Sequence, residues 1–314
     1  MRVGVLLDGP SEEREGSLRS GQAVAQALTE LGHIPVALSV GECPSLLQAL
    51  VELDCVFIAL HGRFGEDGRV QGLLDILGIP YTGSGVAANA VGMHKVLFKR
   101  MLQGAGLPTP PFVSLGTGSP ASEAERVLRV LNPPVILKPV DGGGSLGVAV
   151  ASDVATLASA ISEIRPQFRE LFVEQYIRGT FLTVGLVGTY GAPHAFPVME
   201  IRHPGPVYDY ATKHTPAAAE YVVPAQVPAA AYEAAEEYAR RVYVLLGCHG
   251  PLRVDFMLES GQLPWVIEAN TVPGLSRQGN LPAVAAAGGM CYHELISSIL
   301  SSAFSKSHAT LPKL

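Results

Sequence analysis

The residues whose types and spacing suit chemistry are concentrated in two neighbouring segments of the sequence. Arg253 and Asp255 alternate with apolar residues in one predicted strand, and Glu268 and Asn270 do the same in the next. Side chains alternate along a strand, and either two-residue turn that residues 260–262 allow puts all four polar groups on one face. Two carboxylates and an amide oxygen are the hard ligands that Mg²⁺ prefers. The alternative is the polar outer face of an edge hairpin.

A second candidate is the glycine-rich segment Lys138-Pro-Val-Asp-Gly-Gly-Gly-Ser-Leu-Gly147, which lies between two predicted strands. Successive glycines let backbone N–H groups point at an anion, and Lys138 adds a positive charge beside them. The segment is neither G-x-x-x-x-G-K-[ST] nor a G-x-G-x-x-G that opens a helix. Its context favours a flexible hairpin that covers a phosphate, and the alternative is an ordinary hairpin turn.

The remaining candidates are isolated residues. The predicted strand that ends in Glu174-Gln-Tyr-Ile177 offers polar and apolar edges that an adenine can use. His61 follows an apolar strand and precedes glycine-rich sequence, so it is the histidine most suited to face a ligand. Lys95 and Lys213 are surface lysines by default, because lysine is usually exposed.

The elements that must position these residues alternate between strand and helix. Apolar runs predict strands over 3–7 and 56–60, and apolar residues at helical spacing predict a helix over 18–31 between them. This order predicts an open α/β sheet, in which ligands bind at the carboxyl ends of the strands. Further strands are predicted over 135–139, 148–151, 171–177, from 181, 251–258 and 263–270, and further helices over 153–164 and 232–246.

Composition excludes several classes of protein. With 22 Lys and Arg against 28 Asp and Glu, the net charge of −6 gives no basic excess for binding nucleic acid. No apolar run reaches the ~18 residues of a membrane span, and the first segment turns polar too soon for a signal peptide. None of the four cysteines (Cys43, Cys55, Cys248 and Cys291) forms a C-x-x-C pair. We therefore expect buried free thiols in a reducing cytoplasm, with no zinc cluster.

These segments occur together in an order that resembles the D-alanine–D-alanine ligase family of the ATP-grasp enzymes, over nearly the whole chain. The segments that carry the resemblance are Ser11-Glu-Glu-Arg-Glu-Gly-Ser-Leu18, Ile58-Ala-Leu-His-Gly-Arg-Phe-Gly-Glu-Asp-Gly68, Pro80-Tyr-Thr-Gly-Ser-Gly85, Arg253-Val-Asp255 and Glu268-Ala-Asn-Thr-Val-Pro-Gly274. The resemblance implies a three-domain α/β fold of the ATP-grasp type with an N-terminal open parallel sheet. The implied domains are 1–83, 84–178 and 179–314, with ATP bound between the second and third. It also implies a homodimer.

The resemblance further assigns roles to individual residues. The implied magnesium ligands are Asp255, Glu268 and Asn270. The implied ATP-binding residues are Lys95, Lys138, Gly143, Gly144, Ser145, Glu174, Gln175, Ile177, Phe181 and Lys213. The implied catalytic residues are Arg253, Glu13, His61, Lys213 and His214, of which Arg253 stabilises an oxyanion and Glu13 holds the ammonium of the first amino acid. The implied contacts to the amino-acid substrates are Glu13, His61, Arg253, Gly274, Gly279 and Asn280.

Six positions depart from the family pattern. Gln175 stands where the common family form has lysine. Phe181 stands where the family has a ribose-binding glutamate. Gly144 and His214 replace a serine and a tyrosine that tie the flexible loop over the site, and Gly279 and Asn280 replace a Ser-Leu pair that binds the second amino acid. The phosphoryl-transfer residues are kept, whereas the amino-acid pocket is changed.

The function that the resemblance implies is an ADP-forming carboxylate–amine ligase that uses ATP and Mg²⁺, acts on small amino acids and forms an amide through an acyl phosphate. One alternative is a specialised paralogue that joins a different amino acid or closes an intramolecular amide. Another is a nucleotide-binding protein without turnover, which Phe181 favours and Arg253 opposes. A dinucleotide oxidoreductase lacks its glycine fingerprint after the first strand.

Overall fold

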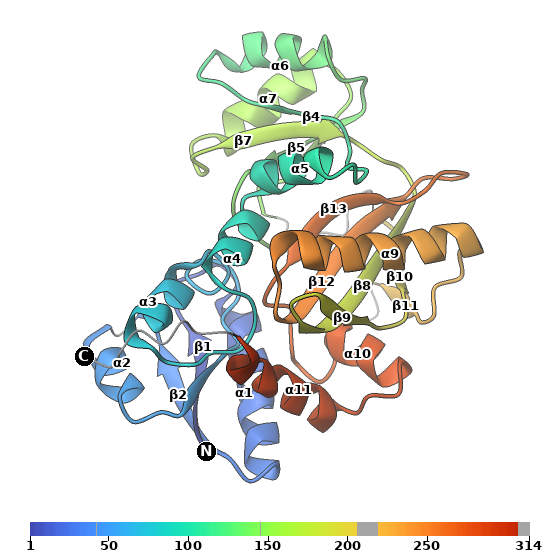
Figure 1. Cartoon of the computed structure of the whole chain (residues 1–314). Coiled ribbons are helices and arrows are strands. Elements are labelled where there is room, and N and C mark those ends of the chain that lie inside the picture. Colours follow the sequence, from blue (N-terminus) through green and yellow to red (C-terminus); the bar gives the residue numbers. More distant parts are fainter. Residues whose placement is uncertain (42, 145, 206–218, 307–314) are drawn as a thin grey trace.

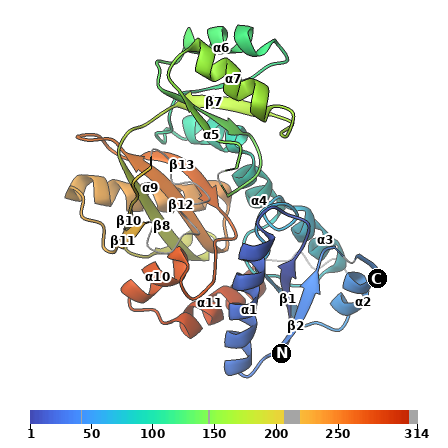
Figure 2. The same ribbon diagram turned by 180° about the vertical axis from the view of Figure 1, so that it is seen from behind.

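Three β-sheets, each covered by its own helices, make up the computed structural model of the chain (Figure 1). The structure describes all residues except 42, 145, 206–218 and 307–314. Figures 1 and 2 show the N-terminal sheet at one end of the molecule and a four-stranded sheet at the other, with the C-terminal sheet beside both. The division of the chain at 83/84 and 178/179 stays a prediction.

The first sheet is parallel and has the strand order β2-β1-β3, which confirms the open parallel sheet expected at the N-terminus. Its elements are β1 (Arg2–Asp8), α1 (Arg14–Glu30), β2 (Ile34–Ser39), α2 (Cys43–Leu50), β3 (Cys55–Ile58) and α3 (Arg69–Leu77). Helix α1 packs tightly on β1 at Gly21, where an added Cβ would lie 2.1 Å from the Cβ of Leu7. This close contact fixes the start of α1, and therefore Glu13, above the carboxyl ends of β1 and β3.

The second sheet is antiparallel, with the order β4-β7-β5-β6. Its strands and the helices around it are α4 (Val86–Met93), α5 (Lys95–Gly104), β4 (Phe112–Ser114), α6 (Pro120–Leu128), β5 (Val135–Pro139), β6 (Ala149–Ala151), α7 (Val154–Ile164) and β7 (Leu171–Gln175). Because side chains alternate, Val135, Leu137 and Val173 pack against α6 and α7, whereas Phe172 and Glu174 face α5 on the other side of the sheet (Figure 1).

The third sheet is antiparallel, with the order β11-β10-β8-β12-β13 and with β9 paired to β8. Its elements are β8 (Thr180–Thr189), β9 (Ala192–Ala195), β10 (Met199–Arg202), β11 (Glu220–Val222), α9 (Ala229–Leu246), β12 (Gly250–Leu258), β13 (Trp265–Asn270), α10 (Asn280–Ala287) and α11 (Tyr292–Ser305). Helix α9 covers one face, where its small residues Ala235 and Ala239 let it approach the strands closely. Helices α10 and α11 pack on the other face.

Two hydrophobic cores join parts of the chain that are distant in sequence. Phe98 and Leu102 of α5 lie in the same core as β8, β12 and α9. Ile296 and Ile299 of α11 lie in the same core as Val3 of β1. The last helix therefore covers both the C-terminal sheet and the N-terminal sheet, and it fixes the two relative to each other.

The described cysteines carry free thiols, but they are not all buried as expected. Cys55 and Cys248 are buried, and Cys291 is exposed at the start of α11. Burial raises the pKa of the Cys55 thiol to about 11 and that of Cys248 to about 12, so neither forms a thiolate readily. The side chain of Cys43 lies outside the described residues.

In the described part of the chain, no single helix is long and apolar enough to cross a membrane. Helices α10 and α11 pass that test only as a pair, and they are bent by 111° at the break between them.

Candidate functional site

A cavity of about 1250 Å³ lies where the three sheets meet. All the described residues singled out in the sequence line it: Glu13, His61, Lys95, Lys138, Gly143, Gly144, Glu174, Gln175, Ile177, Phe181, Arg253, Asp255, Glu268, Asn270, Gly274, Gly279 and Asn280. Ser145, Lys213 and His214 lie outside the described residues. Residues separated by more than 250 positions are thus brought to one cavity.

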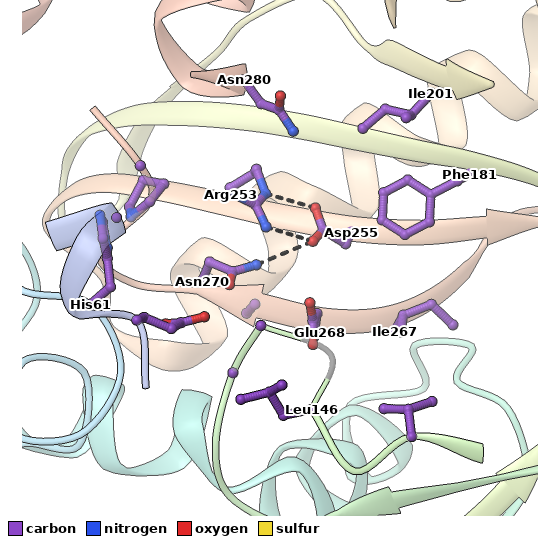
Figure 3. Close-up of a pocket in the computed structure, with 18 of the residues that line it drawn as sticks. His61, Leu146, Phe181, Ile201, Arg253, Asp255, Ile267, Glu268, Asn270 and Asn280 are labelled. Carbon is purple, nitrogen blue, oxygen red and sulfur yellow. Dashed lines mark hydrogen bonds and ion pairs between the residues drawn. The ribbon is translucent and has the colours of Figure 1, made fainter. Parts of the chain in front are cut away.

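The centre of the cavity is the hairpin of β12 and β13. Arg253 lies opposite Asn270, and Asp255 lies opposite Glu268, so the four polar groups share one face as the alternation predicts (Figure 3). The predicted two-residue turn is wrong. An irregularity between Asp255 and Phe256 shifts the register, and the connection spans the six residues 259–264.

Asp255 is almost fully buried, and its carboxylate accepts four hydrogen bonds. Arg253 donates from Nε at 2.9 Å and Nη2 at 2.8 Å, Thr183 donates from its hydroxyl at 2.6 Å, and Asn270 donates from its amide at 3.2 Å. Sequence reasoning missed Thr183, which lies opposite Asp255 on the neighbouring strand β8. A threonine in a strand is too common to indicate a site, and only the pairing of β8 with β12 identifies it.

The donor set at this hairpin fits a hard divalent cation. No group of three or more His, Cys, Asp or Glu side chains within the described ranges could hold a metal ion without other ligands. Asp255, Glu268 and the Asn270 amide oxygen are two acids and one neutral oxygen, and Mg²⁺ prefers few protein ligands completed by phosphate oxygens and water. Because four donors already fill the lone pairs of Asp255, a cation that binds this carboxylate must displace one of them.

Two lysines approach the cavity from the second sheet and its helix. Lys95, in the first turn of α5, donates to the carbonyl oxygen of Gly142 at 2.6 Å. Lys138, on β5, forms an ion pair with Glu174 on β7 at 2.5 Å. Burial alone would raise the pKa of Glu174, but Lys138 and the buried Lys99 outweigh that effect and hold it below its ordinary range. Lys99 was not anticipated from the sequence.

The far end of the cavity is apolar. Phe181 lies beside Ile201 and opposite Ile267 (Figure 3). The neighbouring Gln175 turns its side-chain amide to the chain before β5, where it donates to the carbonyl oxygens of Asn132 at 2.6 Å and of residue 134 at 3.0 Å. The Gln175 amide therefore holds the segment before β5 in place.

Glu13 and the glycine loop close the cavity on the other side. An added Cβ on Gly143 would lie 2.6 Å from Oε1 of Glu13. Its φ angle is not in the left-handed region, so a side chain there would meet only the end of the flexible Glu13 side chain, which would have to move. Gly142 and Gly144, in contrast, have φ angles of 100° and 64°, which favour glycine for backbone reasons.

His61 is buried between the N-terminal sheet and the loop after β13. Its Nδ1 lies 2.9 Å from the carbonyl oxygen of Val272, and its Nε2 lies 2.9 Å from the Ser20 hydroxyl. The Ser20 oxygen also accepts the backbone N–H of Leu275 at 3.2 Å. Burial lowers the pKa of His61, but contacts with Glu66 and the nearby charge of Glu13 exceed that effect and raise the pKa overall. Ser20 was not anticipated from the sequence.

The loop after β13 ends in the first turn of α10. Gly279 precedes that helix, and its backbone N–H donates to the carbonyl oxygen of Ser276 at 2.7 Å. An added Cβ on Gly279 would lie 2.8 Å from the carbonyl oxygen of Gly274. Gly274 and Gly279 therefore form a close backbone contact, and the side chain of Asn280 extends toward the cavity beside it (Figure 3).

Taken together, a cavity enclosed by three sheets, with lysines on one side and paired carboxylates on the other, defines an ATP-grasp protein. Two family models match the chain: "D-ala D-ala ligase N-terminus" over residues 41–84 and "D-ala D-ala ligase C-terminus" over residues 101–301. The chain belongs to the D-alanine–D-alanine ligase family.

Individual relatives agree with this assignment over almost the full chain. The chain is 41% identical to the D-alanine–D-alanine ligase of Bordetella petrii, covering 98% of this chain and 94% of the relative. It is 39% identical to the D-alanine–D-alanine ligase of Moorella thermoacetica, and the match covers 96% of this chain and 98% of that relative. Among solved structures, the D-alanine–D-alanine ligase of Bacillus anthracis complexed with ATP has a TM-score of 0.82 at 29% identity, covering 97% of both chains.

Proposed function

We propose that this protein is an ATP-dependent, ADP-forming ligase of the D-alanine–D-alanine ligase type, which joins the carboxylate of one amino acid to the amine of a second. One observation carries the proposal. Arg253 and two carboxylates from the third sheet line the same cavity as two lysines from the second sheet and its helix α5. That arrangement suits a reaction in which a phosphoryl group and a carbonyl both develop negative charge.

The chemistry takes two steps. An oxygen of the first amino acid's carboxylate attacks the γ-phosphorus of ATP, the bond from that phosphorus to the ADP oxygen breaks, and an acyl phosphate forms. The amine nitrogen of the second amino acid then attacks the acyl carbon to give a tetrahedral oxyanion. As the oxyanion collapses, the C–O bond to phosphate breaks, the nitrogen loses its proton, and the amide remains.

Each step has matching side chains. Lys95 and Lys138 would contact phosphate oxygens. Asp255, Glu268 and Asn270 would hold magnesium, which supplies charge neutralisation to the phosphates when bound. Arg253 is held by two hydrogen bonds to Asp255, so its guanidinium is oriented before the oxyanion forms.

The amino-acid end of the cavity has its own candidates. Glu13 would bind the ammonium of the first amino acid under the glycine loop. His61 is positioned beside it by Ser20 and Val272.

An enzyme is distinguished from a nucleotide-binding protein by Arg253→Ala. Charge develops on the partner oxygen of Arg253 only in the intermediate, so we expect kcat to fall about 100-fold or more while the Kd for ATP changes by less than about threefold. The assay is phosphate release from ATP with D-alanine, beside calorimetric ATP binding. Equal losses in both quantities, or no turnover by the wild type, would favour the binding protein.

A second candidate is a ligase with a different acceptor, which the Gly274–Gly279 contact favours. The backbone N–H of Gly279 already donates to the carbonyl oxygen of Ser276, the position has no hydroxyl for an acceptor carboxylate, and a Cβ there has no room. The test is mass spectrometry of the products formed from D- and L-amino acids, offered singly and in pairs. D-Alanyl-D-alanine as the main product would exclude the second candidate.

The homodimer, the absence of nucleic-acid and membrane partners, and the cytoplasmic location stay predictions. Light scattering during size-exclusion chromatography tests the first of them.

A further inference from the structure

A buried cluster of two lysines and one glutamate lies beneath the second sheet, on the side covered by α5. Glu174 and Lys138 share that face because they lie at diagonal positions of the paired strands β7 and β5. Lys99 reaches the same carboxylate from α5. Figures 1 and 2 both show α5 against this side of the sheet, opposite α6 and α7.

One carboxylate serves both ammonium groups. Oε1 of Glu174 lies 2.5 Å from Nζ of Lys138, and Oε2 lies 2.7 Å from Nζ of Lys99. The Lys138 side chain is 15% exposed and lines the cavity, whereas that of Lys99 is 1% exposed. Two positive charges against one negative charge leave the cluster with an excess of +1. Lys138 and Glu174 both line the cavity, and Lys138 is the lysine of the cluster that does so.

The surroundings of Lys99 are built for an ammonium ion. The Thr109 hydroxyl donates to the carbonyl oxygen of Val266 at 3.0 Å, so its oxygen accepts from Lys99 at 2.5 Å. The carbonyl oxygen of Pro110 accepts from Lys99 at 3.5 Å, and Oε2 of Glu174 forms an ion pair with Nζ at 2.7 Å. Two hydrogen-bond acceptors and one carboxylate suit an ammonium, whereas a neutral amine would point its lone pair at one of these oxygens.

An aromatic ring adds to this environment. Nζ of Lys99 lies 5.5 Å from the centre of the Phe112 ring, within the range of a cation–π contact. Burial and the nearby charge of Lys138 lower the pKa of Lys99 overall, although the Glu174 carboxylate opposes that effect. Lys99 is buried away from the cavity lining, and yet its surroundings supply several partners for a positive charge.

We propose that Lys99 is a positioning residue that neutralises Glu174, so that the Lys138 ammonium faces the cavity with an uncompensated positive charge for nucleotide phosphates. The inference rests on the proposed function, because it takes the anion in the cavity to be ATP. Without Lys99, Glu174 and Lys138 would form a neutral pair, and the attraction of Lys138 for an anion would be largely cancelled.

The test compares the affinity for ATP with the affinity for adenosine, at constant Mg²⁺. In Lys99→Met we expect the Kd for ATP to rise about tenfold, because one positive charge near the phosphates is lost. The Kd for adenosine should stay within about twofold, since adenosine has no phosphate. Lys99→Gln, whose amide can still donate to Glu174 and Thr109, should show the same loss and serves if the methionine variant does not fold.

Two further variants complete the experiment. Lys99→Met combined with Glu174→Gln restores the excess of +1 on Lys138. Because Glu174 is itself an implied ATP-binding residue, the quantity compared is the ratio of the Kd for adenosine to the Kd for ATP, which should return to within about threefold of the wild-type ratio. Arg100→Gln removes a positive charge from the exposed side of the same helix and should change neither affinity.

The outcomes separate the two proposals. Parallel weakening of ATP and adenosine binding in the Lys99 variants would show a merely structural role and overturn the inference. So would an unchanged Kd for ATP, or a double variant whose ratio of the adenosine Kd to the ATP Kd stays as low as in Lys99→Met. A wild type that fails to bind ATP would overturn the proposed function and this inference together.

Discussion

At the scale of single residues, Glu268 provides the sharpest test of the magnesium site. Replacing it by glutamine keeps the size of the side chain and removes one of the two carboxylates. We expect Glu268→Gln to lower phosphate release by about 100-fold or more, because charge neutralisation by a metal contributes several kcal/mol to the transition state. The measurement is the steady-state rate across a range of Mg²⁺ concentrations.

Glu259→Gln is the matched control, since Glu259 is exposed at the tip of the same hairpin. It should leave the rate unchanged. Normal turnover of Glu268→Gln at about 1 mM Mg²⁺ would contradict the assignment, given how few protein ligands Mg²⁺ takes.

A second prediction at this scale concerns His61 and its neighbour Glu66. The pKa of His61 in the folded chain is raised above its ordinary value of 6.5, chiefly through Glu66 once the opposing effect of burial is overcome. The pair therefore stabilises the fold below that value, and the stabilisation is lost as the pH rises through the folded pKa. We expect Glu66→Gln to destabilise the protein by about 1.5–3 kcal/mol near pH 6 and by less near pH 9.

Urea unfolding of the wild type and the variant at the two pH values measures this difference. In a His61→Gln background the effect of Glu66→Gln should no longer depend on pH. If the effect of Glu66→Gln still depended on pH in that background, a titrating group other than His61 would be responsible for the pH dependence.

At the scale of elements, the contact between the glycine loop (residues 142–144) and the start of α1 can be tested by mutation. A Cβ on Gly143 would lie 2.6 Å from Oε1 of Glu13, so in Gly143→Ala either the Glu13 side chain turns aside or the loop moves away from α1. Either change weakens the contact between the loop and α1. We expect faster chymotrypsin cleavage after Leu146, which is 37% exposed in the loop. The free energy of unfolding should change by less than about 1 kcal/mol, since the loop contributes little to the core.

The double variant Gly143→Ala/Glu13→Ala removes the carboxylate that causes the clash. Its cleavage rate should return toward that of Glu13→Ala alone. Equal acceleration with and without Glu13 would show that the glycine matters for another reason.

The elements also show what the sequence could and could not predict. Strict alternation around Arg253 and Glu268 predicted the shared face of β12 and β13 correctly, because side-chain direction in a strand depends only on position. The prediction of a two-residue turn was wrong, because the irregularity after Asp255 changes the register of the strands and leaves no pattern in the sequence. The strand expected over 171–177 ends at Gln175, two residues early.

The partners that the sequence did not reveal share one property. Thr183, Lys99 and Ser20 are ordinary residues in regular elements, and each acquires its role from a segment distant along the chain. Ser20, for example, contacts the backbone N–H of Leu275, 255 positions away. Such contacts depend on how the sheets pack together, and periodicity within one segment carries no information about that packing.

At the scale of the whole molecule, the N-terminal and C-terminal sheets are joined by a close backbone contact. Gly250, which begins β12, has a φ of 65°, and an added Cβ would lie 2.9 Å from Cα of Gly83. The Ser302 hydroxyl of α11 accepts the Gly83 N–H at 3.2 Å in the same place. The two sheets that enclose the cavity are therefore held together at a point where position 250 has no room for a side chain.

This contact yields the last prediction. Gly250→Ala combines the strain of a left-handed backbone, about 1–2 kcal/mol, with a clash between the two sheets. Gly261→Ala is the matched control, because Gly261 has a similar φ of 72° and nothing within 4 Å of an added Cβ. We expect Gly261→Ala to lower the unfolding free energy by about 1–2 kcal/mol, and Gly250→Ala by about 3 kcal/mol or more. Only Gly250→Ala should also weaken ATP binding, because the cavity is enclosed by the sheets that this contact joins. Equal losses of stability in the two variants, measured by urea unfolding, would mean that the sheets can separate slightly at no cost and that the contact does not fix the cavity.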